Sequence, residues 1–383
     1  MLARSGRGGP PRLLFVVTED WYFVSHRLPL AMAARREGFK VAVATRIARH
    51  RQEIDRAGIE AIPLKHLVRS SVNPWREALA VSELVRTYRR WEPDIVHHVA
   101  LKPVLYGSIA ARLAGVRGCV NALPGLGYAF SAKGMKAGAV RLLVRGILAW
   151  VARSRAWHNI VQNKEDERLL RKLGASRSRT HLIKGAGVDL ERFQCEGPPD
   201  GNVVMMAGRM LWSKGVGDFV EMARLLKGRG IGARFVLLGE PDEANPDCVP
   251  RELLEEWNRS HVVEWGGYRS DIEKALCGAA IVCLPTTYGE GVPKILLEAA
   301  SCGRPIVAYD VPGCREIVQD GVNGLLVRPG DVKRLMSAVV ELLQDEARRA
   351  AMGAMGRRIV LQEFAQELVH RDTLEVYRLL VQG

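Results

Sequence analysis

The sequence predicts an α/β protein built from two doubly wound, Rossmann-like domains. Three observations predict this fold class. Short apolar runs alternate with amphipathic segments, the pattern restarts after a Gly- and Pro-rich stretch at residues 197–201, and 383 residues exceed what one ordinary core holds. We therefore expect two parallel sheets whose facing strand ends form one deep ligand-binding cleft.

Apolar runs and amphipathic segments alternate in the first half. Buried parallel strands are expected at residues 12–17, 40–45, 94–99 and 118–123, with helices at 28–36 and 75–90. We place this domain at residues 1–195.

The second half repeats the alternation. Strands are expected at residues 202–208, 234–239, 262–267, 281–285, 305–309 and 324–327. Helices are expected at residues 217–227, 250–258, 271–277, 294–301 and 332–344. We place this domain at 196–360, followed by a C-terminal helix at 361–383. That helix belongs to an amphipathic segment starting near residue 357, and it is expected to return to the first domain.

Charge is distributed unevenly along the chain. Residues 1–184 hold 33 Lys and Arg against 13 Asp and Glu, a net charge of +20, whereas the remainder carries −6. A strongly basic half indicates an anionic partner, namely a nucleic acid, an acidic membrane or a phosphorylated substrate. The basic residues lack interleaved aromatics, and no nucleic-acid-binding signature occurs, so we expect no nucleic acid.

The seven cysteines are scattered and form no CxxC pair. This pattern argues against a zinc site and against a disulfide framework, and it is typical of a reducing, cytoplasmic compartment. No stretch is long and apolar enough to span a bilayer.

Residues 129–157 combine basic and apolar side chains and contain no acidic residue. Such a segment suits the anionic inner face of a membrane, to which we expect the protein to bind peripherally, although a core helix with a solvated basic face also fits. The basic members are Lys133, Lys136, Arg141, Arg145, Arg153 and Arg155.

The stretch from Ile281 to Gly313 is the most informative. A strand is followed by a loop with Glu290, and a helix is expected to begin near Pro293, where a missing N–H costs nothing. Exposed N–H groups of Gly291, Val292 and the helix start favour an anion. Glu298 lies about one and a half turns into that helix and could face the same cleft, although alone it equally fits a solvated surface glutamate.

A second loop carries two cations. Gly208 and Arg209 end a strand, and Lys214 precedes the next helix. A diphosphate leaving group needs positive charge at such a strand end, because negative charge builds on it as a glycosidic bond breaks. No DxD pair occurs where a metal would bridge a diphosphate, so we expect no obligatory metal and no cofactor.

Residues 208–330 resemble the C-terminal domain of family 4 retaining glycosyltransferases of the GT-B fold. The resemblance rests on GRMLWSKGVGDFVEMA, FVLLGE, the two glutamates separated by seven residues, and VPGCREIVQDGVNGLLVRPGD. It implies that Arg209 and Lys214 hold the donor diphosphate, that Glu290 contacts the donor sugar and that Glu298 contacts the ribose. It also implies a retaining, metal-independent transfer. The pocket around Gly239 and Tyr268 is expected to select the base and sugar, with a UDP-sugar favoured over a GDP-sugar.

The first domain resembles enzymes that add hexoses or amino sugars to polyprenyl-diphosphate-linked intermediates of bacterial surface polysaccharides and lipopolysaccharide. The sequence departs from that family at Thr18-Glu19-Asp20-Trp21, where many members have a Gly-rich loop. It also departs at Asn121 and Gly125, where many have a histidine. Acceptor-side candidates are therefore His26, His98, Lys102, Asn121 and Gly125, although His98 fits a structural role better than a site role, and His26 fits a helix cap equally well.

The expected partners are thus a nucleotide-sugar donor, a lipid-linked or glycan acceptor, and an anionic membrane surface. A nucleotide-sugar epimerase of the same fold is the alternative, since it would bind the donor without transfer. A dinucleotide dehydrogenase is excluded because no GxGxxG follows the first strand.

Overall fold

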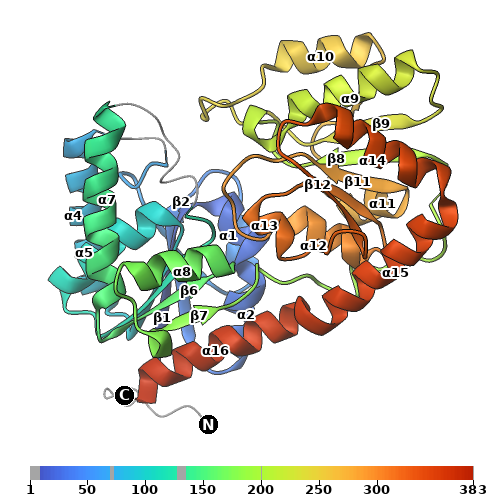
Figure 1. Ribbon diagram of the computed structural model, residues 1–383. Coiled ribbons are helices and arrows are strands. Elements are labelled where there is room, and N and C mark those ends of the chain that lie inside the picture. Colours follow the sequence, from blue (N-terminus) through green and yellow to red (C-terminus); the bar gives the residue numbers. More distant parts are fainter. Residues whose placement is uncertain (1–8, 70–72, 127–134, 200, 383) are drawn as a thin grey trace. The chain divides into compact units, whose positions relative to one another are not determined.

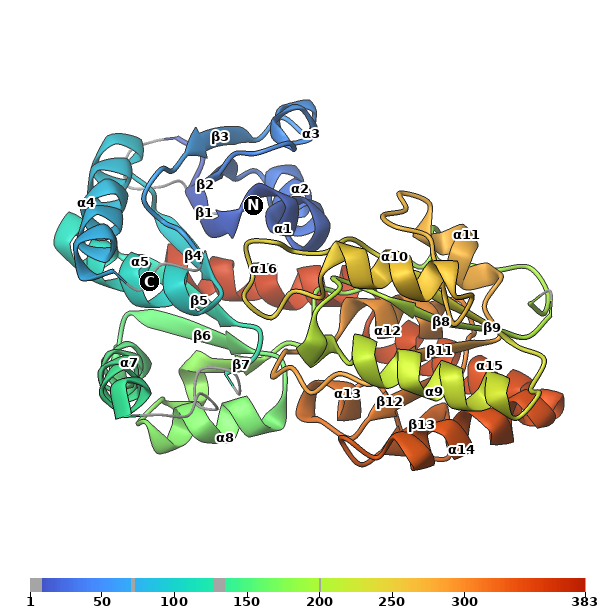
Figure 2. The same ribbon diagram turned by 90° about the horizontal axis from the view of Figure 1, so that it is seen from above.

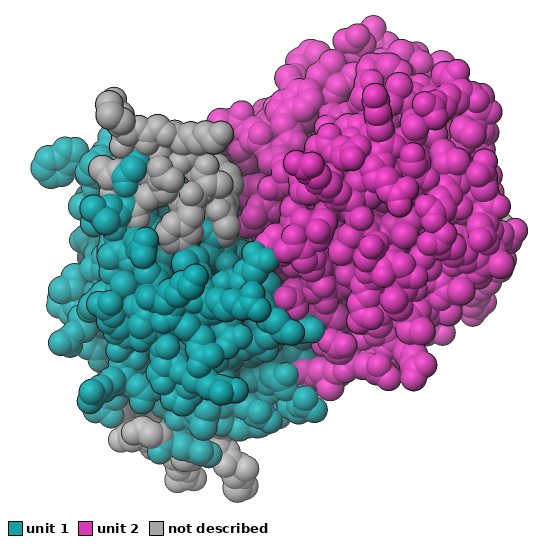
Figure 3. Space-filling view, viewed as in Figure 1, with its two compact units in different colours: residues 1–186, 369–383 teal, residues 187–368 magenta. Residues whose placement is uncertain are grey.

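The computed structural model describes residues 9–69, 73–126, 135–199 and 201–382 and divides them into two compact units. Unit 1 contains residues up to Ala186 together with residues from Val369 onward, and unit 2 contains Gly187–Leu368 (Figure 3). The chain therefore changes unit earlier than the expected position after residue 195. Contacts within unit 2 explain this, because the Phe193 carbonyl accepts hydrogen bonds from Ser301 Oγ (2.8 Å) and Arg357 Nη1 (2.7 Å).

Unit 1 (Figure 1) is built on a seven-stranded parallel sheet, whose order β3-β2-β1-β4-β5-β6-β7 can be followed in Figure 2. Its strands are β1 (Arg12–Glu19), β2 (Lys40–Arg46), β3 (Glu60–Pro63), β4 (Ile95–Val99), β5 (Gly118–Leu123), β6 (Trp157–Val161) and β7 (Thr180–Leu182). Its helices are α1 (Asp20–His26), α2 (Leu28–Arg36), α3 (Arg51–Arg56), α4 (Pro74–Trp91), α5 (Leu101–Ala114), α7 (Met135–Arg153) and α8 (Lys164–Lys172), with a 3-10 turn η1 (Arg177–Arg179).

Alternate side chains of β1 enter two apolar cores, one on each face of this sheet. Leu14 and Val16 enter a core that α4, α5, α7 and α8 cover. Leu13, Phe15 and Val17 enter a second core on the opposite face, formed with α2 and α16 (Gln366–Gln382). A strand with apolar side chains on both faces is what a parallel sheet covered by helices requires.

Unit 2 is built on a six-stranded parallel sheet of order β10-β9-β8-β11-β12-β13. Its strands are β8 (Val203–Ala207), β9 (Arg234–Leu238), β10 (Glu264–Trp265), β11 (Ile281–Leu284), β12 (Ile306–Tyr309) and β13 (Gly324–Val327). Its helices are η2 (Trp212–Lys214), α9 (Val216–Gly228), α10 (Arg251–Arg259), α11 (Ile272–Cys277), α12 (Lys294–Ser301), α13 (Pro312–Arg315), α14 (Val332–Gln344) and α15 (Glu346–Glu363). In Figure 2, α9 lies beside α14 and α12 beside α15, as their contacts require.

The C-terminal segment forms two helices rather than one continuous helix from residue 357. Phe364 and Ala365 separate α15 from α16, because the backbone here pairs with Val188 instead of continuing the helix. The Val188 N–H donates to the Phe364 carbonyl (3.0 Å), and the Gln366 N–H donates to the Val188 carbonyl (3.0 Å). Beyond this break, Tyr377 of α16 is fully buried and contacts the rings of Phe39 and His97 in unit 1.

A disulfide joins Cys195 to Cys277 within unit 2. The scattered cysteines argued against a disulfide framework, yet this one pair is bonded. A separation of 82 residues concealed it, because sequence spacing says nothing about which distant segments the fold brings together. Among the described residues, no helix combines the length and apolar character needed to cross a membrane.

Candidate active site

The carboxyl ends of β8 and β9 approach closely at two glycines. A Cβ added to Gly239 (φ 136°) would lie 1.8 Å from the Gly208 carbonyl oxygen. The Gly208 N–H donates to the Leu238 carbonyl (2.9 Å), which keeps the two strand ends together. Gly239 is thus needed for backbone packing beside the strand end that carries Arg209, whereas a Cβ at Gly208 would have nothing within 4 Å.

The loops after β8 and β11 are joined through Gly215 and Ser213. Gly215 has φ 84°, and a Cβ there would lie 2.0 Å from the Pro285 carbonyl oxygen. The Ser213 carbonyl accepts N–H groups of Thr287 (2.8 Å) and Tyr288 (3.0 Å). This joint places Lys214 beside the loop that contains Glu290.

Lys214 and Glu290 form an ion pair at this joint. Lys214 Nζ lies 2.6 Å from both carboxylate oxygens of Glu290, and the two side chains are only 13% and 19% exposed. Thr286 Oγ1 adds a hydrogen bond to Glu290 Oε1 (3.4 Å). The cation expected to hold phosphate and the carboxylate expected to hold sugar hydroxyls are therefore adjacent, although 76 residues separate them in the sequence.

Arg209 follows the carboxyl end of β8 and pairs with Asp242. Arg209 Nη1 lies 2.8 Å from Asp242 Oδ2, with the side chains 29% and 17% exposed. Among the described residues, the side chains grouped closely enough to hold a metal ion are three cysteines, so Asp242 belongs to no carboxylate cluster there. The expected metal independence stays a prediction.

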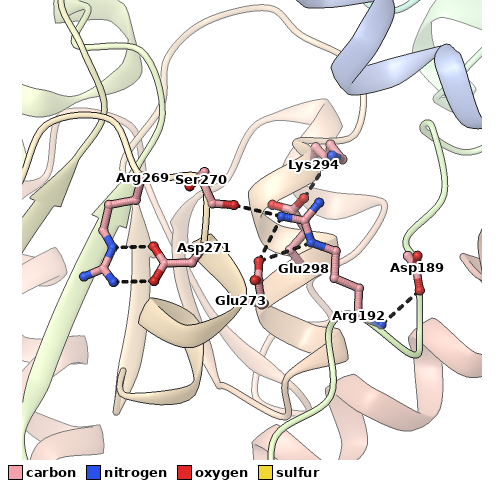
Figure 4. Close-up of polar contacts among 8 residues, drawn as sticks. All are labelled: Asp189, Arg192, Arg269, Ser270, Asp271, Glu273, Lys294 and Glu298. Atoms are coloured by element: carbon pink, nitrogen blue, oxygen red, sulfur yellow. Dashed lines mark hydrogen bonds and ion pairs between the residues drawn. The ribbon is translucent and has the colours of Figure 1, made fainter. Parts of the chain in front are cut away.

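Glu298 lies on the second turn of α12. Pro293 precedes the helix as its N-cap, in agreement with the expected helix start. The Glu298 side chain is buried, and burial raises the pKa of its carboxyl, while the Lys294 ammonium at 3.0 Å opposes that increase. Figure 4 shows this pair beside the Arg192–Glu273 pair. Glu298 is thus a paired, buried carboxylate and not a solvated surface glutamate.

Three further donor-side candidates differ in exposure, because Tyr268 is exposed whereas Gly291 and Val292 are buried. Tyr268 is 73% exposed, and its backbone N–H donates to Glu240 Oε1 (3.2 Å). The Gly291 carbonyl lies against Gly313, where an added Cβ would come within 1.9 Å of that oxygen. Val292 is buried in the core of unit 2.

Sequence reasoning missed Asp247 and Arg192. Asp247 Oδ2 accepts the Ser213 N–H (2.9 Å) and also contacts the Ser213 hydroxyl, which positions the turn before Lys214. Arg192 donates to Glu273 (2.9 Å) and to the Ser270 carbonyl (3.0 Å), close to Glu298. Neither residue lies in a recognisable motif, so the sequence contained no signal for either contact.

In unit 1, His98 and Asn121 lie in the core and not at an open surface. His98 is fully buried, with Nδ1 2.8 Å from Asn121 Oδ1 and Nε2 3.0 Å from the Tyr88 hydroxyl. Burial lowers the pKa of His98 to about 4. Ser108 Oγ also donates to Asn121 Oδ1 (3.1 Å). These contacts correct the candidate acceptor role of both residues to a structural one, because neither side chain reaches solvent.

The other acceptor-side candidates lie at helix and strand ends. His26 ends α1 rather than starting a helix, with Nδ1 2.6 Å from Ser25 Oγ and its ring stacked on Tyr22. Lys102 Nζ is held by Glu77 (2.9 Å) and the Val68 carbonyl (2.8 Å). Gly125 follows β5 with φ 123°.

Asp20 begins α1 directly after β1, in the segment that lacks a Gly-rich loop. Its buried carboxylate accepts N–H groups of Ala48 (2.7 Å), Arg49 (2.9 Å) and His50 (3.0 Å). A carboxylate therefore satisfies the backbone donors of residues 48–50 and ties the end of β1 to the loop after β2.

The basic segment of unit 1 includes α7. Leu142 and Leu143 are 74% and 65% exposed, and Arg145 is exposed beside them. The two leucines help to line a groove of about 520 Å³, together with Ile109, Gly146, Ile147 and Trp150. Lys133 lies outside the described residues, as do the side chains of Lys136 and Arg141.

Both halves of the chain match known protein families. Residues 12–154 match the family described as "Glycosyl transferase 4-like", and residues 201–345 match the one described as "Glycosyl transferases group 1". The first match falls in unit 1 and the second in unit 2.

Two relatives and one solved structure extend the comparison. The N,N'-diacetylbacillosaminyl-diphospho-undecaprenol alpha-1,3-N-acetylgalactosaminyltransferase of Campylobacter jejuni is 28% identical, over 92% of this chain and 94% of that protein. The UDP-Gal:alpha-D-GlcNAc-diphosphoundecaprenol alpha-1,3-galactosyltransferase of Escherichia coli is 25% identical, over 71% and 72%. The fold matches Anabaena Alr3699/HepE in complex with UDP-glucose, with a TM-score of 0.76 over 96% of this chain and 99% of that one, at 19% identity.

Proposed function

Because this chain belongs to the family 4 glycosyltransferases and has their GT-B fold, we propose that it moves a hexose or N-acetylhexosamine from a nucleotide diphosphate sugar to a polyprenyl-diphosphate-linked or other glycan acceptor. The acceptor class is supported by the C. jejuni and E. coli relatives, whose names specify diphospho-undecaprenol-linked acceptors. The E. coli name also specifies a UDP-sugar, which is the donor class we favour. Such a reaction serves bacterial surface polysaccharide biosynthesis.

The Lys214–Glu290 pair carries this proposal. Two opposite charges, both largely withdrawn from water, lie at the joint between the β8 and β11 loops. In the proposed complex, donor phosphate oxygens accept hydrogen bonds from Lys214 Nζ, and Glu290 turns its carboxylate to the sugar hydroxyls. Arg209 supplies a second cation at the same strand end. Both cations then stabilise the charge that develops on the diphosphate as the glycosidic bond breaks.

We propose that the transfer retains the anomeric configuration and uses neither a metal nor a cofactor. The bond from the anomeric carbon to the diphosphate oxygen breaks, and the bond to the acceptor oxygen forms on the same face. The acceptor hydroxyl proton passes to the leaving phosphate oxygen, so no side chain has to serve as the base. Arg209 and Lys214 take the electrostatic role that a divalent cation serves elsewhere.

The deciding experiment combines a panel of UDP- and GDP-sugars with a bacterial lipid extract as acceptor. Wild type is compared with Glu290→Gln and with Glu221→Gln, a matched control that alters an exposed ion pair on α9. Every part of the proposal is supported if the release of nucleotide diphosphate requires both the extract and Glu290, continues in the presence of EDTA, and yields an α-linked product from an α-linked donor. Conversion of the donor sugar without nucleotide release would instead indicate an epimerase.

We also propose that the enzyme is cytoplasmic and peripheral on the inner face of the membrane, with α7 as its contact. The exposed Leu142 and Leu143 supply apolar area next to Arg145, a combination that suits an anionic lipid surface. A polyprenyl-linked acceptor would be presented at that surface.

A further inference from the structure

The Cys195–Cys277 disulfide lies in a protein whose other cysteines are thiols. Cys119, Cys283, Cys302 and Cys314 are buried and free, and Cys248 is half-buried and free. Cys195 and Cys277 are also only half-buried, so a dissolved thiol or disulfide can reach them. Their Cα atoms lie 5.4 Å apart, within the range of a disulfide.

The disulfide joins the two segments that also meet near Glu298. Cys195 follows Arg192 by three residues, and Cys277 lies one helical turn after Glu273 on α11. Arg192 and Glu273 form an ion pair at 2.9 Å (Figure 4). The disulfide therefore holds the Arg192 segment against the helix that carries the partner of Arg192.

The charges of this pair act on Glu298. Arg192 lowers the pKa of the Glu298 carboxyl, and Glu273 raises it. Phe193, next to Arg192, also accepts a hydrogen bond from Ser301 on α12, the helix that carries Glu298. Movement of the segment 189–195 would thus change both the electrostatics and the support of Glu298.

We propose that Cys195 and Cys277 form a reversible thiol–disulfide site that reacts with small-molecule disulfides, and that its oxidised state favours nucleotide binding at the neighbouring Glu298. The second half rests on the proposed function. In the forward step, a cysteine thiolate attacks a small disulfide such as oxidised glutathione and releases one small thiol. The second cysteine thiolate then attacks the mixed disulfide, which forms Cys195–Cys277 and releases the other small thiol. The two cysteine thiols lose two electrons and two protons, and the small disulfide gains both.

Cys302 is the third sulfur of this cluster, within 4.8 Å of the other two. It lies in the core, and burial raises the pKa of its thiol to about 12, although the charge of Arg304 opposes that increase. At pH 7 only about one such thiol in 100,000 is the thiolate that attacks disulfides. Cys302 therefore stays outside the exchange, and the bond stays between Cys195 and Cys277.

Thiol counting tests the site directly. The chain is equilibrated in glutathione buffers of graded redox ratio, quenched, alkylated in denaturant and weighed. We expect two populations, with five and seven alkylated cysteines, that interconvert reversibly. Cys302→Ser and Cys248→Ser should keep the two-thiol step, whereas Cys195→Ser and Cys277→Ser should abolish it. Seven free thiols at every ratio, Cys302 in the crosslink, or stoichiometric zinc or copper retained by the three sulfurs would each overturn the assignment.

Calorimetry with UDP tests the coupling in the wild-type chain, which avoids any folding defect of a variant. We expect reduction of the wild-type chain to weaken UDP binding roughly 3- to 10-fold. The same treatment should leave the UDP affinity of Cys195→Ser unchanged. Reduction should also lower Tm by roughly 5 °C or more. Equal UDP affinity in both redox states would overturn the coupling. Absence of UDP binding in both states would contradict the proposed function, while the thiol counts would still decide the cysteine site.

Discussion

Lys214 Nζ contacts both carboxylate oxygens of Glu290 at 2.6 Å, in a position where each side chain is less than one-fifth exposed. Two groups with different expected ligands thus neutralise one another. On the proposed function, a bound diphosphate would compete with Glu290 for Lys214, so we expect the carboxylate to disfavour the diphosphate alone and to favour a ligand that also offers sugar hydroxyls. We therefore expect the pair to discriminate between the whole donor and the nucleotide diphosphate that leaves after transfer.

This competition predicts opposite effects of the two substitutions on UDP binding. Lys214→Met should weaken UDP binding roughly 10- to 100-fold, because it removes a charge-assisted hydrogen bond to phosphate. Glu290→Gln should preserve or strengthen UDP binding, because it removes the competing charge, yet lower kcat roughly 100-fold or more. Calorimetry with UDP and steady-state kinetics measure the two effects. Weakened UDP binding in Glu290→Gln would contradict the competition, and Glu221→Gln should change neither quantity.

Gly239 should resist even the smallest side chain. A methyl group there would meet the Gly208 carbonyl at 1.8 Å, and φ of 136° disfavours any L residue. We expect Gly239→Ala to destabilise unit 2 by about 3 kcal/mol or more and to weaken donor binding, since the strand end that carries Arg209 must move. Gly230→Ala is the control, because Gly230 has φ 73° and nothing within 4 Å, and it should cost about 1 kcal/mol. If urea unfolding shows similar losses of unfolding free energy for Gly239→Ala and Gly230→Ala, the clash at Gly239 is relieved at little cost.

Local patterns predicted much of unit 2. The helix Lys294–Ser301 was expected at its observed residues because Pro293 and the apolar spacing mark its start. The strand Trp157–Val161 was not expected, because its Trp-His-Asn sequence lacks a continuous apolar run, and Thr180–Leu182 is only three residues long. Both strands owe their place to pairing within the sheet and not to local propensity.

The sequence identified the residues of the candidate site, whose roles stay predictions, but it did not identify their contacts. Arg209, Lys214, Glu290 and Glu298 stand in a recognisable order, whereas the Lys214–Glu290 pair and the Cys195–Cys277 bond join positions 76 and 82 residues apart. For His98, the sequence pattern suggested a site residue where the structure has a buried one. A histidine at the end of an apolar strand has the pattern of a site residue, and only its burial against Tyr88 and Asn121 shows a structural role.

Buried histidines should make unit 1 sensitive to acid. Burial lowers the pKa of His98 to about 4, and burial together with the charges of His181 and Arg179 lowers the pKa of His158 to about 4. Between pH 6.5 and 4 the unfolded chain binds protons at these two histidines and the folded chain does not. Their contribution to the free energy of unfolding is therefore complete above pH 6.5 and is lost as the pH falls toward 4. For the fully buried His98 this amounts to roughly 3 kcal/mol.

Hydrogen exchange of peptides from β4, β5 and β6 at pH 7, 6, 5 and 4.5, corrected for intrinsic rates, measures this loss. The free energy of opening should fall with each step, and it should fall less steeply in His158→Asn, which removes one of the groups. Constant protection between pH 7 and 4.5 would contradict the expectation.

The surface of α7 should bind anionic membranes through apolar insertion as well as charge. Leu142 and Leu143 lie beside Arg145, and all three are exposed, so their replacement leaves the core intact. We expect Leu142→Ser/Leu143→Ser to reduce sedimentation with phosphatidylglycerol vesicles at least 5-fold, and Arg145→Ser to reduce it less and in a salt-dependent manner.

The control is Leu361→Ser/Leu379→Ser, which replaces equally apolar exposed residues on α15 and α16. If both leucine pairs change vesicle binding equally, general surface hydrophobicity governs it and α7 is not the contact. Unchanged turnover of a short-chain, water-soluble acceptor analogue by Leu142→Ser/Leu143→Ser would separate membrane binding from chemistry.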